Sequence, residues 1–224
     1  MHTSQTSACA SASGEEQARR YKALGYDGII ITDHFFNGNC HQFIKDCEDW
    51  QEKVELFAKG YEAAKAEGDR IGLDVFFGFE YCYHGADLLI YGIDKQWLKD
   101  HPECMQVSVF DFCDMVHDSG GAIVHAHPFR EAGYLQEIRL VPQKTDAVEV
   151  YNGGNAKMIY NDRAKFYAES FNFPQTGGTD NHHLWVDKLS GVLLSAKLKS
   201  IDDYVFDILN DNIPGVVYPD DLNY

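Results

Sequence analysis

Short apolar runs alternate with longer stretches of helical spacing along this chain. The runs are rich in valine, isoleucine and phenylalanine, which favour buried strands. The stretches between them repeat apolar residues every three or four positions, as amphipathic helices do. Repeated alternation of strand and helix indicates an α/β fold. The predicted strands are residues 28–32, 73–79, 88–92, 122–124, 147–151 and 192–194, and the predicted helices are residues 14–24, 43–66, 107–117 and 155–169.

Histidines and carboxylates follow the apolar runs directly. In α/β folds the carboxyl ends of parallel strands meet at one edge of the sheet, and ligands bind there. We therefore expect the residues after successive strands to share one site. These residues are Thr32-Asp33-His34, Glu80, His125-Ala126-His127-Pro128 and Thr179-Asp180-Asn181-His182.

The composition is that of a globular chain with a sizeable core. Of the 224 residues, 45% are hydrophobic and 24% are charged, and no stretch approaches the roughly 18 apolar residues that span a bilayer. No linker or repeat divides the chain, so we expect one domain over residues 1–224. The six cysteines have no metal-binding or disulfide-rich spacing, which favours reduced thiols in the cytoplasm.

The charge balance restricts the partners. Nineteen basic and 35 acidic residues give a formal net charge of −16, and such a field repels phosphate backbones. Duplex nucleic acid is therefore not expected as a partner, and neither is a membrane. A small substrate suits this surface better than a long polyanion.

The clustered histidines and acids form a ligand set for divalent metals. Neutral imidazoles combined with carboxylates suit zinc, manganese or iron. Six candidates are enough for two ions and a bridging carboxylate, and a two-metal centre is suited to phosphoester hydrolysis. The six candidate ligands are His2, His34, Glu80, His127, Asp180 and His182.

Five short motifs occur in order along almost the whole chain. Together they resemble those of the PHP (polymerase and histidinol phosphatase) domain superfamily of metal-dependent phosphoesterases. The motifs are Met1-His2-Thr3, Thr32-Asp33-His34, Gly78-Phe79-Glu80, Ala126-His127-Pro128 and Gly178-Thr179-Asp180-Asn181-His182.

The resemblance implies a fold, a centre and a reaction. The fold is a distorted seven-stranded β/α barrel with two to three metal ions at its carboxyl mouth. His2, Glu80 and Asp180 would bind one ion, Glu80 would bridge to a second held also by His127, and the remaining imidazoles, His34 and His182, would face a third position. A metal-activated hydroxide would attack a small phosphate monoester, such as a histidinol phosphate or a nucleotide.

The sequence departs from the superfamily pattern in three places. Where many members carry an aspartate or histidine for the third ion, this chain has Ser7 and Ala8, with Cys9 close by as a candidate. The first histidine of the H-x-H motif and the strand before it are missing ahead of Met1, so we expect a truncated first strand and favour a start placed too late. Before the run Leu88–Gly92, Asp87 stands where many members carry a histidine, and His84 lies three residues earlier. Either residue is a candidate ligand of the second ion.

Arg130 follows the A-H-P motif as H-P-F-R. A guanidinium is a planar fork that fits the oxygens of a phosphate, so Arg130 joins His34 and His182 as a candidate catalytic residue. The alternative is an ordinary surface salt bridge to Glu131 or Glu137. At the end of the strand at 147–151, Glu149 and Asn152 are candidates for orienting the imidazoles.

Three alternatives to a phosphatase stay open from the sequence. The first is a catalytically impaired metal-binding or regulatory domain, which the missing first histidine supports. The second is a nuclease on short oligonucleotides, although no basic track for successive nucleotides is evident. The third is hydrolysis of a C–N bond, for which related barrels use similar ligands. The physiological substrate, the native metal and the oligomeric state are not fixed by the sequence.

Overall fold

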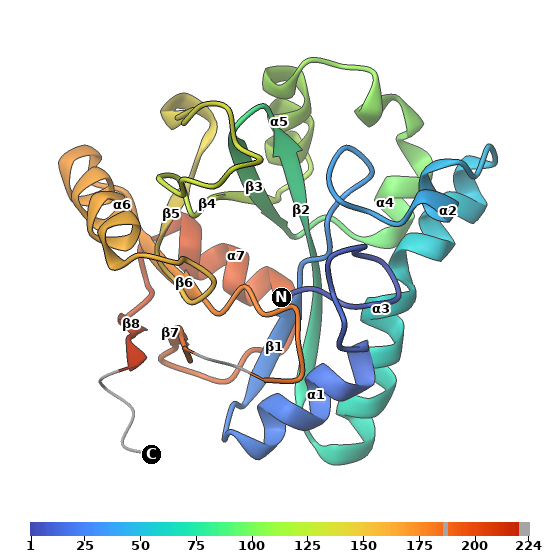
Figure 1. Ribbon diagram of the computed structural model, residues 1–224, viewed down its shortest axis with the longest axis horizontal. Coiled ribbons are helices and arrows are strands. Elements are labelled where there is room, and N and C mark those ends of the chain that lie inside the picture. The colour runs from blue at the N-terminus through green and yellow to red at the C-terminus, as the bar shows by residue number, and fades with distance from the viewer. Residues whose placement is uncertain (186–187, 220–224) are drawn as a thin grey trace.

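A computed structural model describes residues 1–185 and 188–219, and Figure 1 shows their arrangement. Within these residues, a curled mixed sheet of six strands in the order β1-β2-β3-β4-β5-β6 forms a half-barrel, and β7 and β8 pair separately. The α/β prediction is therefore confirmed. The strands are β1 (Gly28–Ile31), β2 (Asp74–Tyr83), β3 (Ala86–Tyr91), β4 (Ala122–Ala126), β5 (Ala147–Asn152), β6 (Gln175–Gly178), β7 (Gly191–Leu193) and β8 (Gly215–Val217).

The helices cover the sheet unequally. The outward residues of β1, β2 and β3 pack against α1, α3 and α5, and those of β5 pack against α6. The opposite face of β3 and β4 packs against α7 instead. The helices are α1 (Gly14–Ala23), α2 (Gln42–Lys45), α3 (Trp50–Ile71), α4 (Lys95–Asp100), α5 (Val109–Asp118), α6 (Met158–Phe171) and α7 (Ile201–Leu209), with 3₁₀ turns at Pro102–Met105 and Pro142–Lys144.

One strand of the sheet runs against the others. β3 is antiparallel to both β2 and β4, whereas the pairs β1–β2, β4–β5 and β5–β6 are parallel. β2 and β3 are joined through His84 and Gly85, which both have positive φ, of 38° and 85°. Positive φ at both central residues is the geometry of a tight hairpin turn. The start of β3 therefore lies at the same edge as the carboxyl ends of the parallel strands.

The expected distorted barrel of seven strands is confirmed only in part, because the sheet is a half-barrel and, over residues 1–185 and 188–219, the count of seven is not reached. In the described residues the main sheet has six strands, and β1 and β6 are its two unpaired edges. The first residues of the chain bridge these edges: Thr32 N–H donates to Met1 O and His2 N–H donates to Asn181 O, both at 2.9 Å. Beneath this bridge, a cavity of about 820 Å³ is lined by residues of both edges, including Ile30 and Thr176.

The predicted elements match the observed ones where an apolar pattern is strong. The single helix predicted at 43–66 is in fact two, α2 and α3, because Asp49 caps α3 by accepting from Glu52 N–H at 2.8 Å. The pattern missed β6, whose sequence QTGG has no apolar run, and it also missed β8, α4 and α7. In the described part of the chain, no helix combines the length and apolar character that a bilayer crossing needs.

At Gly60, α3 lies very close both to α1 and to the residues Thr3 and Asp33. A Cβ added to Gly14 of α1 would overlap Gly60 O, so these helices cross at backbone contact distance. A Cβ added to Gly60 would in turn overlap Thr3 Oγ1 and lie 2.7 Å from Asp33 Oδ2. Glycine at position 60 therefore allows the first residues of the chain and the end of β1 to pack on α3.

Replacing Gly60 with alanine should destabilise the protein, although alanine is favoured in helices by up to about 1 kcal/mol. The added methyl overlaps Thr3 and Asp33, and overpacking of this kind costs about 1–3 kcal/mol. The measurement is the free energy of unfolding in urea, with the exposed neighbour variant Lys59→Ala as the control. Equal or greater stability of Gly60→Ala would contradict this account of the packing.

Candidate metal centre

The predicted site residues come together at the carboxyl edge of the sheet. His34 follows β1, Glu80 lies near the end of β2, His127 follows β4, and Asp180 and His182 follow β6. The bridge formed by the first residues of the chain adds His2, and the reversed strand β3 adds Asp87. The strand ends and the first residues of the chain thus gather side chains that lie up to 180 positions apart in the sequence.

Glu80 is at the centre of this arrangement. Its Oε2 lies 3.1 Å from His2 Nε2 and 3.4 Å from His34 Nδ1, and its Oε1 lies 3.3 Å from His127 Nε2. Among the residues that the structure describes, four groups of three side chains have donor atoms within 4.8 Å of one another, and Glu80 belongs to three of them. The groups are His2-His34-His182, His34-Glu80-Cys82, His2-Glu80-Asp180 and Glu80-Asp87-His127.

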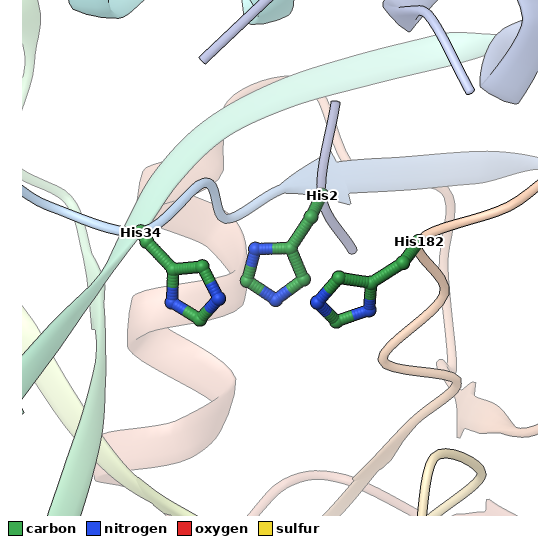
Figure 2. A group of neighbouring side chains, drawn as sticks. All are labelled: His2, His34 and His182. Atoms are coloured by element: carbon green, nitrogen blue, oxygen red, sulfur yellow. The ribbon is translucent and has the colours of Figure 1, made fainter. Parts of the chain in front are cut away.

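Three imidazoles lie in a row, as Figure 2 shows. The His2 ring is between those of His34 and His182, with 4.2 Å between ring centroids on each side and interplanar angles of 27°. The rings come from three separate segments of the chain. One ring nitrogen from each lies within 4.8 Å of the others, although the three residues do not belong to one local motif.

Burial and the neighbouring charges set different protonation states along this row. Burial lowers the pKa of His34 to about 3 and that of His182 to about 4, and the charge of His2 adds to both shifts. Burial also disfavours a charged His2, but its hydrogen bonds to Asp180 and Glu80 outweigh it and raise the pKa to about 9. Near neutral pH, His2 is therefore protonated and the two outer imidazoles are neutral.

The two carboxylates that contact His2 are ionised. Burial would raise the pKa of Glu80, but the charge of His34 and the hydrogen bonds from His127 and His2 hold it well below its usual range. Burial would also raise the pKa of Asp180, but the charge of Arg130 holds it well below its usual range.

Asp33 fixes the first residues of the chain in the site. Its Oδ1 accepts from the backbone N–H of Thr3 and from Ser7 Oγ, both at 2.6 Å, and its Oδ2 accepts from Thr3 Oγ1 at 2.7 Å. Ser7 Oγ in turn accepts from His34 N–H at 3.0 Å and lies 3.3 Å from His2 Nδ1. Asp33 and Ser7 thereby hold His2 and His34 in place.

Arg130 is engaged by the site itself. Its Nη2 donates to Asp180 Oδ2 at 2.6 Å and to Asn152 Oδ1 at 2.7 Å, and its Nε donates to Asn155 Oδ1 at 2.9 Å. It is therefore paired with Asp180, and neither Glu131 nor Glu137 is its salt-bridge partner. The Arg130 guanidinium, which we expected to bind phosphate, therefore binds a carboxylate of the site.

Glu149 and Asn152 lie next to this pair. Glu149 Oε2 accepts from the backbone N–H of His127 at 3.0 Å and from Asn152 Nδ2 at 2.8 Å. Both His127 and Asp180 have positive φ, of 29° and 49°. Non-glycine residues rarely adopt this conformation, and such strain concentrates at functional sites.

His84 and Asp87 occupy different positions. His84 is exposed at the tip of the β2–β3 turn, with its ring against Tyr83, and belongs to none of the four donor groups. Asp87 Oδ2 lies 3.8 Å from His127 Nε2, and Asp87 belongs to the group with Glu80. Of the two alternatives, only Asp87 is placed beside the other candidate ligands.

Sequence reasoning missed three participants: Ser7, Asn155 and Cys82. Their contacts to Asp33, Arg130 and His34 join segments distant in the sequence, so no local motif reveals the first two. For Cys82 a signal exists, since residues two apart on a strand face the same side and Cys82 follows Glu80 by two. Burial and the charges of Asp87 and Glu80 raise the pKa of this thiol well above its usual range.

The donor set fits divalent cations. In a tetrahedral site with metal–nitrogen and metal–oxygen bonds of about 2.0 Å, donor atoms are about 3.3 Å apart, and the contacts around His2 and His34 measure 3.1–3.4 Å. The centre also has buried carboxylates that need positive charge. Without metal ions, that charge comes from Arg130, from the proton on His2 and from His127. Burial disfavours a charged His127, but its hydrogen bond to Glu80 and the charges of Asp87 and Glu80 raise its pKa.

Comparison with known proteins gives matches in fold. No protein-family model matches the chain, and no curated protein matches its sequence. A two-domain protein from Bacteroides vulgatus that contains a predicted PHP-like metal-dependent phosphoesterase aligns with 98% of this chain at 14% identity and a TM-score of 0.68. This chain spans 63% of that protein's length. The chain shares its fold.

Two further solved structures align over most of both chains. A putative metal-dependent phosphoesterase from Bifidobacterium adolescentis aligns with 94% of each chain, at 15% identity and a TM-score of 0.54. An amidohydrolase from Chromobacterium violaceum, solved with bound sulfate and no metal, covers 97% of this chain and 96% of its own, at 15% identity and a TM-score of 0.55. At these identities the likeness concerns the fold.

The raised pKa of His2 predicts how the metal-free protein responds to pH. The ordinary pKa of histidine is about 6.5, so the protonated ring stabilises the fold fully below pH 6.5. This contribution is lost as pH rises through about 9. In chelator-treated protein, the unfolding free energy of the wild type should fall relative to His2→Gln across this interval, by about 3 kcal/mol at most. A constant difference between the two proteins would contradict the assignment.

Proposed function

We propose that this protein is a metal-dependent phosphoesterase that hydrolyses a small phosphate monoester. The observation that carries the proposal is the sharing of one buried carboxylate, Glu80, by three groups of donor atoms at one edge of the sheet. Such sharing suits adjacent metal positions bridged by a carboxylate. The fold shared with proteins named as metal-dependent phosphoesterases supports the same reaction class.

The proposed ligands divide among two to three positions. His2, Glu80 and Asp180 would hold one divalent ion, and Glu80, Asp87 and His127 would hold a second. The neutral imidazoles of His34 and His182 would serve a third. When bound, zinc, manganese or iron supplies Lewis-acid polarisation of a phosphoryl oxygen and a nucleophilic water at neutral pH.

The surrounding residues keep these ligands oriented and charged. Arg130 holds Asp180 in its ionised form. Glu149 fixes the backbone of His127, and Asn152 links Glu149 to Arg130. We therefore assign Arg130 as a positioning residue for Asp180.

The size and charge of the substrate follow from the protein's electrostatics. A net charge of −16 opposes the approach of a long polyanion, whereas bound cations make the centre locally attractive to a single phosphate group. A phosphate monoester meets both conditions. A short oligonucleotide is the less favoured alternative, because it places several charges against the acidic surface.

Hydrolysis of a C–N bond is the second candidate reaction. It is favoured by the likeness in fold to an amidohydrolase, and a carbonyl oxygen responds to Lewis acids as a phosphoryl oxygen does. Turnover of phosphate esters without turnover of amides would exclude it.

The direct test is hydrolysis of p-nitrophenyl phosphate by protein loaded with manganese or zinc, with the bound metal counted by elemental analysis. Asp180→Ala and His127→Ala should each lower turnover by more than the roughly 10- to 100-fold cost of changing a residue outside the ligand set. His101→Ala, a surface histidine paired with Glu103, is the control. Full activity in both site variants would overturn the assignment, and bound metal without turnover would favour a regulatory domain.

Arg130→Lys tests the positioning role. Lysine keeps the charge but cannot bond Asp180, Asn152 and Asn155 together, so metal affinity should fall about 10- to 100-fold. At saturating metal the KM for p-nitrophenyl phosphate should stay near the wild-type value. Unchanged metal affinity with a raised KM would instead make Arg130 a direct ligand of the substrate phosphate.

A further inference from the structure

One thiol faces the centre alongside the nitrogen and oxygen donors. Cys82 lies two residues after Glu80 on β2, and side chains two apart on a strand share a face. Its partner across the β2–β3 hairpin is Asp87, another donor of the site. Cys82 is therefore on the inner face of the sheet and is partly buried there.

The sulfur has a defined place among the donors. Cys82 Sγ lies 3.9 Å from His34 Nδ1, and that nitrogen lies 3.4 Å from Glu80 Oε2. The three donor atoms fall within 4.8 Å of one another. A tetrahedral zinc ion with bonds of about 2.3 Å to sulfur and 2.0 Å to nitrogen separates those two donors by about 3.5 Å. The observed spacing is close to this value.

The surrounding backbone keeps the sulfur in this place. Gly38, in the segment after β1, passes so close that a Cβ there would lie 2.6 Å from Cys82 Sγ. On the same segment, Asn37 Nδ2 donates to Cys82 O at 2.7 Å and Asn37 Oδ1 accepts from Cys82 N–H at 3.3 Å. The loop that carries His34 is thus fastened to the strand that carries Cys82.

We propose that Cys82 and Glu80 complete the third metal position, the one that His34 faces, and give it one sulfur, one nitrogen and one oxygen donor. The inference rests on the proposed metal centre and specifies which metals it selects. Thiolate is a soft ligand that favours zinc and cobalt over manganese and magnesium. The position should therefore take zinc in preference to manganese, and the bound metal would hold Cys82 as a thiolate, with its proton released to solvent.

Cobalt binding tests this inference without using enzymatic activity. Chelator-treated, reduced protein is titrated with Co²⁺, bound cobalt is counted by elemental analysis, and the near-ultraviolet spectrum is recorded. A cobalt–thiolate bond gives a charge-transfer band that nitrogen and oxygen ligands do not give. The wild type should show this band, and Cys82→Ser should lose it while still binding cobalt at the remaining positions.

Two other cysteines provide controls. Cys47→Ser alters a thiol that donates to Asp49 O outside the donor groups, and Cys9→Ser alters an exposed thiol. Both variants should keep the band. A band that persists in Cys82→Ser, or that disappears in Cys9→Ser, would overturn the assignment of Cys82.

The outcomes also separate this inference from the proposed function. Bound cobalt without any thiolate band would refute the role of Cys82 and leave the metal-dependent phosphoesterase standing. No bound cobalt in the wild type would remove the metal centre itself and the inference with it. As a further check, Cys82→Ser should weaken binding of Zn²⁺ but not of Mn²⁺, and equal losses for the two ions would contradict the selectivity.

Discussion

A buried carboxylate in an apolar strand requires positive charge nearby, and Glu80 imposes this requirement on the whole site. It is almost fully buried near the end of β2, where an ionised acid without partners would cost several kcal/mol. Three imidazoles surround it: those of His2 and His127, whose pKa values are raised, and the neutral imidazole of His34. Because each comes from a different segment, satisfying one charge draws together the chain's first residues, the end of β1 and the end of β4. A divalent ion meets the same electrostatic requirement more completely than a shared proton.

The sheet topology makes this convergence possible. Parallel strands place their carboxyl ends at one edge, and the reversal of β3 brings an amino end to that same edge. Asp87 enters the site by this route. The unpaired edges of β1 and β6 leave room for His2 to enter from the side, and Asp33, packed on Gly60 of α3, fixes its position. The donor side chains are thus positioned by the pairing of the strands and by the contact of Asp33 with α3 at Gly60.

The sequence predicts the parts of this structure that local patterns encode. Apolar runs locate the main strands, and the residues that follow them identify His34, Glu80, His127 and Asp180 as neighbours, because strand ends converge in any α/β sheet. Local patterns do not encode the bonds from Asp33 to Thr3 and Ser7, since these join segments about 30 positions apart. The same limit applies to Arg130. From the sequence, an arginine after the A-H-P motif is as well suited to bind phosphate as to pair with a carboxylate. The three-dimensional contacts show that it pairs with Asp180.

Under the proposed function, charge balance at the centre links metal binding to substrate binding. In the absence of metal ions, Glu80 and Asp180 are ionised, and the positive charges that contact Asp180 are Arg130 and the His2 proton. Arg130 is already bonded to Asp180, and His2 is bonded to both carboxylates. The positive charges of these four residues are therefore already paired with carboxylates and are not free to bind a phosphate. The net charge of −16 also repels a phosphate. Under the proposed function, divalent ions would add charge that the protein's own ligands do not fully neutralise, and metal binding would precede substrate binding.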